Sequence, residues 1–177
     1  MSQRFPKSIW VVTVLTAVIL GVWPGIVLAQ ENYTGFVALI GWFAFPLGIY
    51  QLLTGQFRFD SLAQFQWLMS LAYPFAMLGY SACAYWTIRR TGIMRKGLIV
   101  VVIAAFVSTL VTIPVAMIAM SIIQHMSVGF FGLFLGYLPA LGMHAIILIH
   151  LLISAVLGWL IGAGLARLRR RNTLVVA

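Results

Sequence analysis

The chain has 177 residues, of which 63% are apolar and only 7% are charged, and its mean hydropathy is +1.09. A soluble domain carries about 25% charged residues, so this composition excludes an ordinary water-soluble protein and predicts a membrane protein. The net charge of +9 does not indicate nucleic-acid binding, because the Lys and Arg residues stand in short clusters between apolar runs rather than on one face among stacking aromatic residues.

Several apolar segments are long enough to cross a lipid bilayer. A hydrocarbon core about 30 Å thick requires roughly 20 apolar residues in a helix. The uncharged segments that approach or exceed this length are residues 9–29, 36–54, 65–88, 97–123 and 143–166. We therefore predict an all-α fold, a polytopic bundle of four or five transmembrane helices that forms a single membrane domain over residues 1–177.

The first segment, residues 9–29, also resembles a secretory signal peptide. Arg4 and Lys7 precede its apolar run, and Pro24 with Gly25 interrupts the run before a small-residue end. We interpret it as a signal anchor, a spanning helix that stays in the protein.

The second segment, residues 36–54, contains possible helix breakers. Gly41, Pro46 and Gly48 could make it enter the membrane and return on the same side instead of crossing. The choice between these two alternatives decides whether the chain has five spans or four.

The last apolar run must break because it continues for about 39 residues, nearly 60 Å as one helix. Pro139 removes a backbone donor and Gly142 follows closely, so the break is expected there. Residues 143–166 then form a full span, whereas residues 128–138 are too short to cross and are predicted to be re-entrant or interfacial.

The positions of the basic residues predict the orientation. Short cytoplasmic connections are enriched in Lys and Arg, so loop 89–96 and the C-terminus are predicted to face the cytoplasm of a multi-pass cell inner membrane protein. Each cation near an anionic leaflet contributes about 1 kcal/mol, so we also expect these clusters to contact anionic lipid headgroups. The residues concerned are Arg89, Arg90, Arg95, Lys96, Arg167, Arg169, Arg170 and Arg171.

The distribution of charge and the length of the apolar segments favour different numbers of spans. Five spans leave Arg4, Lys7 and Arg58 outside, whereas four spans leave only Arg58 outside. Charge therefore favours four spans, and we favour five because an apolar segment as long as 36–54 normally crosses.

The scarcity of acidic residues and cysteine limits the possible chemistry. Glu31 and Asp60 are the only carboxylate side chains, and both are expected in loops. Proton relays and metal-dependent membrane enzymes normally need carboxylates within the spans. Cys83 is the only cysteine, so no disulfide or thiolate cluster is expected. The sequence therefore predicts no catalytic residues.

Histidine provides the main candidate site. His125, His144 and His150 are all predicted in the outer half of the membrane, and a pair that includes His125 could bind b-type haem across two helices. Ala140, His144 and Leu148 also have the spacing of a pigment-binding histidine in bacterial light-harvesting helices, although the rest of the chain does not resemble those short polypeptides. The structural alternative is that these side chains make ordinary interfacial or internal hydrogen bonds.

Small residues predict where helices pack. Ser154, Gly158 and Gly162 recur every four residues and form one ridge on the last span. Such ridges allow helix backbones to approach closely in lipid. The ridge is expected to pack within the chain, and the alternative is that it docks a second subunit.

Together these patterns predict a non-catalytic small subunit of a larger membrane complex, in contact with the bilayer and with other membrane subunits or further copies of itself. One alternative is a haem- or pigment-binding membrane module that uses the histidines. Another is a small oligomeric solute transporter or channel, in which Pro46 and Pro139 mark broken helices.

Overall fold

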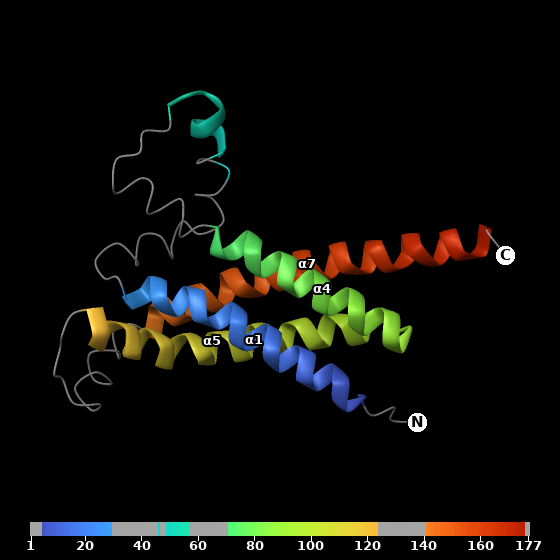
Figure 1. Cartoon of the computed structure of the whole chain (residues 1–177), viewed down its shortest axis with the longest axis horizontal. Coiled ribbons are helices and arrows are strands. Elements are labelled where there is room, and N and C mark those ends of the chain that lie inside the picture. Colours follow the sequence, from blue (N-terminus) through green and yellow to red (C-terminus); the bar gives the residue numbers. More distant parts are fainter. Residues whose placement is uncertain (1–4, 30–45, 47–48, 57–70, 124–140, 176–177) are drawn as a thin grey trace.

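The protein is described by a computed structural model in which residues 5–29, 46, 49–56, 71–123 and 141–175 are placed. Within these residues all regular secondary structure is helical. The long helices are α1 (Lys7–Ala29), α4 (Ala72–Thr91), α5 (Met94–Ile123) and α7 (Leu141–Val175). A short helical stretch at residues 49–53 stands apart from them (Figure 1). The all-α prediction is confirmed for the described residues.

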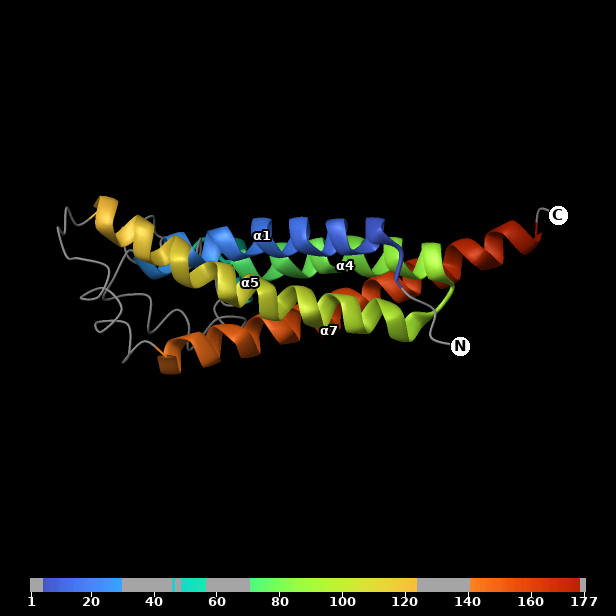
Figure 2. The same ribbon diagram turned by 90° about the horizontal axis from the view of Figure 1, so that it is seen from below.

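The long helices coincide with predicted segments but differ at their ends. Residues 9–29 and 97–123 lie within α1 and α5. The predicted segment 143–166 lies within α7, which continues as a helix through the C-terminal arginines. Because its 35 residues span about 52 Å, the end of α7 projects beyond the other helices (Figure 2).

Three of the predicted segments lie partly or wholly outside the described residues. α4 accounts for residues 72–88 of the predicted segment 65–88. Of the segment 36–54, the structure describes residue 46 and residues 49–54. The short segment 128–138 lies wholly outside the described residues.

Two stretches within the described residues are long and apolar enough to cross a membrane. They are Met94–Ala116 in α5 and Ala145–Arg170 in α7, with mean hydropathies of 2.7 and 2.4. Lys7–Trp23 in α1 is apolar but shorter. α4 is less apolar than these helices, and it packs against α7, α5 and α1.

The four long helices alternate in direction and form one elongated bundle (Figures 1 and 2). α1 and α5 start at the end of the bundle where α4 and α7 finish. The main partner of α1 is α5, the main partner of α4 is α7, and α5 joins the two pairs by contacting both α4 and α7.

A tight turn joins α4 to α5. Gly92 ends α4 in the left-handed conformation, with φ of 74°, and its N–H donates to the carbonyl of Ile88 at 2.8 Å, which is the usual role of glycine after a helix. α7 is tied to this turn because Trp159 Nε1 donates to the carbonyl oxygen of Met94 at 3.1 Å. This hydrogen bond holds the start of α5, next to the turn, against α7.

Glycines lie where paired helices cross. A Cβ on Gly158 would lie 2.6 Å from the carbonyl oxygen of Met77, and a Cβ on Gly162 would lie 2.5 Å from that of Ser81. Gly21 and Gly25 on α1 meet α5 in the same way. In a membrane, where lipid supplies little hydrophobic drive between helices, such close contact would be a main source of their association.

Hydroxyl groups also connect the helices across the interior. The Tyr80 hydroxyl of α4 lies 3.1 Å from Ser108 Oγ of α5. Thr112 Oγ1 donates toward the carbonyls of Ser108, at 2.9 Å, and of Gly21 on α1, at 3.1 Å. These contacts satisfy polar groups inside the bundle and link α1, α4 and α5.

We predict that Gly162→Ala destabilises the bundle by about 1–3 kcal/mol, because the added methyl group overpacks the contact with the α4 backbone. Gly164→Ala is the matched control, since a Cβ there meets nothing within 4 Å. It should be neutral or stabilising by up to about 1 kcal/mol, because alanine favours the helix over glycine. The measurement is the free energy of unfolding in mixed detergent–SDS micelles, and equal effects of the two variants would contradict the prediction.

We predict a favourable coupling between Tyr80 and Ser108 of about 0.6 kcal/mol, the typical strength of an interhelical hydrogen bond in lipid. A double-mutant cycle built from Tyr80→Phe and Ser108→Ala measures it as the non-additive part of the change in unfolding free energy. Strict additivity would show that the two hydroxyls do not interact.

Candidate functional site

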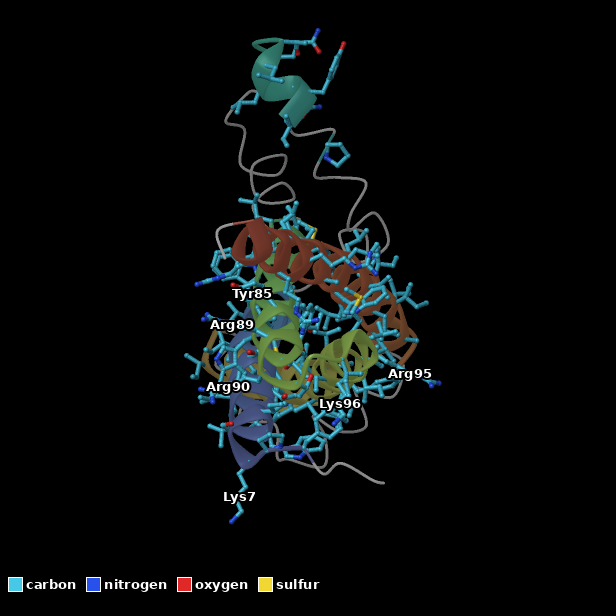
Figure 3. The ribbon with its side chains drawn as sticks, turned by 90° about the vertical axis from the view of Figure 1, so that its right-hand side faces the viewer. Lys7, Tyr85, Arg89, Arg90, Arg95 and Lys96 are labelled. Carbon is cyan, nitrogen blue, oxygen red and sulfur yellow. The ribbon has the colours of Figure 1, made fainter. Side chains whose placement is uncertain are left out.

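Basic residues of all four long helices lie at one end of the bundle, and Figure 3 labels those of α1, α4 and α5. Lys7 begins α1, Arg89 and Arg90 lie in the last turn of α4, and Arg95 and Lys96 lie in the first turn of α5. Arg167, Arg169 and Arg170 lie at the C-terminal end of the membrane-length stretch Ala145–Arg170 of α7, which is at the same end of the bundle (Figure 2). We call this the basic end; it includes every Lys and Arg in the described segments.

Two of these cations lie against aromatic rings. Arg90 Cζ is 5.1 Å from the Trp86 ring centroid, and Lys96 Nζ is 5.2 Å from that of Phe5. A cation–π contact at an exposed site contributes about 0.5–1 kcal/mol. These contacts hold Arg90 and Lys96 at the surface, on ring systems typical of a membrane interface.

A cleft of about 260 Å³ lies between the C-terminal parts of α4 and α7. The residues that line it are Tyr85, Arg89, Ala166, Arg169 and Arg170. Residues three or four apart share a face of a helix, so Tyr85 and Arg89 line the α4 wall, while Ala166, Arg169 and Arg170 line the α7 wall. We call it the basic cleft. The small side chain of Ala166 leaves the space between the arginines open.

The arginines of the basic cleft are positioned by contacts with α4 and the turn. Arg169 Nη1 donates to the Tyr85 hydroxyl at 3.1 Å. A guanidinium nitrogen of Arg170 lies 3.3 Å from where a Cβ would stand on Gly92, so this arginine reaches over the turn from α7. The two α7 guanidinium groups are thereby directed toward α4, where Arg89 adds a third.

The charge balance of the chain makes this end attractive to anions. The chain has eleven Lys and Arg side chains and two Asp and Glu side chains, so its cations far outnumber its own carboxylates. The C-terminus of α4 adds partial negative charge equivalent to about half an elementary charge, which does not offset three guanidinium groups. The arrangement favours an anion with several oxygen acceptors, because guanidinium groups bind such anions through paired hydrogen bonds.

His150 lies away from the basic cleft, in the interior of the bundle. His150 is buried in α7, 6% exposed, and its ring centroid is 4.8 Å from that of Tyr73 on α4. His144 lies in the first turn of α7, and His125 lies outside the described residues. One face of the His150 ring is therefore occupied by an aromatic side chain.

The small residues of α7 face α4 within the same chain. Ser154 is fully buried and its Oγ donates to the carbonyl of His150 at 2.9 Å. Gly158 and Gly162 lie against the α4 backbone, as described above. Where the ridge meets α4, its surface is covered, so docking of a second subunit there would require α4 to move.

Among the described residues, no three His, Cys, Asp or Glu side chains come together in a group that could hold a metal ion. Cys83 is a buried free thiol in α4. Glu31 and Asp60 lie outside the described residues.

The basic cleft includes two residues that the sequence did not single out, Tyr85 and Ala166. The available signal was spacing: Tyr85 precedes Arg89 by one helical turn, and Ala166 precedes Arg170 by one turn. These spacings define one face on each helix, but the sequence does not show that the two faces meet.

Comparison with known proteins assigns no family. No protein-family model, no curated protein and no solved structure matches the chain.

Proposed function

We propose that this protein is a non-catalytic subunit of a larger membrane complex, which crosses the cell inner membrane four times with its basic end in the cytoplasm. The observation that carries the proposed orientation is the basic end, where helix ends distant in the sequence place their cations at the same end of the bundle (Figure 3). A bundle with cations at one end and apolar helices beyond them is oriented by the positive-inside rule.

Helix direction supports four crossings rather than five. α1 finishes and α4 starts at the end of the bundle opposite the basic end (Figures 1 and 2). If both helices cross the membrane, the segment between them leaves and returns on the same side. A single crossing by residues 36–54 would place the end of α1 and the start of α4 on opposite sides of the membrane, so we propose four spans here, although apolar length alone favours five.

The outer surface supports a subunit embedded among lipids or other helices. α1 exposes an apolar row that includes Val11, Leu15 and Ile19, which are 56–64% exposed. Inside the bundle, glycine contacts and hydroxyl hydrogen bonds join the helices. This combination is suited to a rigid structural element whose outer faces contact lipid or neighbouring chains.

We predict that Lys7→Cys and Arg95→Cys are both labelled by a membrane-impermeant maleimide in inside-out vesicles and both protected in right-side-out vesicles. Ile122→Cys, at the far end of α5, should show the opposite pattern. The native thiol gives little background, because Cys83 is 2% exposed. Labelling of Lys7→Cys from the outside would restore the five-span topology.

We also predict that the protein, extracted in a mild detergent, purifies with other membrane chains in a fixed molar ratio that survives size-exclusion chromatography. The same tag on an unrelated multi-pass protein controls for adventitious association. A homogeneous, stable monomer that lacks other chains would contradict membership of a complex.

A further inference from the structure

We propose that the basic cleft binds the phosphate of one anionic phospholipid, with an acyl chain of that lipid lying along the adjoining surface of α7. The inference rests on the proposed function for one premise, that this end of the bundle lies at a membrane surface. It goes beyond a general attraction to the leaflet because it assigns a defined site with a stoichiometry of one.

The polar half of the site matches a phosphate group. Arg89 approaches from α4, and Arg169 and Arg170 approach from α7. The planar fork of guanidinium donors fits phosphate oxygens. The Tyr85 hydroxyl accepts from Arg169, and a hydroxyl can donate at the same time, so it can give its own hydrogen to a phosphate oxygen.

The apolar half of the site distinguishes a lipid from a free anion. A second groove, of about 390 Å³, is lined by Tyr85, Leu165, Leu168 and Arg169. It shares Tyr85 and Arg169 with the basic cleft, so the polar and apolar surfaces adjoin. Inorganic phosphate or an acidic peptide segment would use the arginines alone, whereas a phospholipid uses both surfaces.

The position of the cleft along the bundle is the one expected for lipid headgroups. Arg89 lies in the last turn of α4, and Trp86, one turn-length earlier on the same helix, carries the cation–π contact with Arg90. On α7 the lining arginines close the membrane-length stretch Ala145–Arg170. Aromatic and basic residues in this order mark the boundary between acyl chains and headgroups.

Binding at this place would join α4 to α7. The phosphate would contact arginines from both helices, just beyond the glycine contacts at Gly158 and Gly162. A ligand that binds the folded bundle and not the unfolded chain stabilises the fold. The bound lipid is therefore expected to raise the thermal stability of the bundle as well as to occupy the cleft.

The test is native mass spectrometry of the intact chain in a neutral detergent, titrated with phosphatidylglycerol, with phosphatidylcholine or with inorganic phosphate. We expect one phosphatidylglycerol to be retained per chain, phosphatidylcholine to be retained at least tenfold more weakly, and equimolar inorganic phosphate not to compete. Thermal unfolding in the same detergent should shift upward with phosphatidylglycerol only.

Variants locate the site. Arg89→Gln and Arg169→Gln should each weaken phosphatidylglycerol retention about fivefold, the factor expected for one cation near an anionic headgroup. Arg95→Gln removes the same charge from an exposed position on the opposite flank of the basic end (Figure 3) and should leave retention unchanged. Ala166→Leu should also weaken retention, because it fills the cleft without changing the charge.

Ala166 lies in a buried cluster with Ile88 and Ala163, where a larger side chain can prevent folding. If Ala166→Leu does not fold, the variants of the exposed arginines still test the proposal. An equal loss in Arg95→Gln would overturn the proposal in favour of diffuse charge attraction. Competition by equimolar inorganic phosphate would overturn the lipid assignment. Because the titration in detergent does not depend on orientation or on other subunits, its failure is distinct from failure of the topology and co-purification experiments.

Discussion

The close approach of α4 and α7 is the constraint on which the other features of this protein depend. At Gly158 and Gly162 the two backbones meet where no larger side chain fits. This contact fixes the rotation of each helix about its axis. Two turns further along, that rotation brings Arg169 within 3.1 Å of the Tyr85 hydroxyl. The basic cleft is thus a geometric consequence of a packing contact deeper in the bundle.

Interior hydroxyl groups complement the glycine contacts. Apolar side chains distinguish poorly between lipid and another helix, so they specify a particular partner weakly. A hydroxyl buried in the bundle is costly unless it finds an acceptor. Tyr80 and Thr112 reach acceptors on neighbouring helices, and these directional contacts favour one arrangement of α1, α4 and α5. Close contact supplies the attraction and hydrogen bonding supplies the specificity.

The sequence predicts helices better than it predicts their contacts. The helices at 9–29 and 97–123 follow from apolar length alone, because a membrane core leaves few other folds. The end of α4 was expected at residue 88, yet the helix continues to Thr91 and ends at Gly92, since arginines are favourable in a last helical turn. The basic cleft could not be predicted, because the faces that meet on α4 and α7 are set by packing. The surroundings of His150 likewise depend on which residue of α4, here Tyr73, lies opposite.

The arginines at the ends of α4 and α7 can serve orientation and binding together. Orientation requires only that cations stay on one side of the membrane, and any position in the loop or the tail satisfies that requirement. Arg95 lies on the opposite flank of the basic end (Figure 3) and does not line the basic cleft, so we assign it only to the proposed orientation. Arg89, Arg169 and Arg170 meet a stricter condition, since they share one cleft with a tyrosine hydroxyl and adjoin an apolar groove. Under the two proposals, the number of charges explains the position of Arg95, and the geometry of the cleft explains the positions of the other three arginines. Orientation and lipid binding can therefore be tested separately within one cluster of like charges.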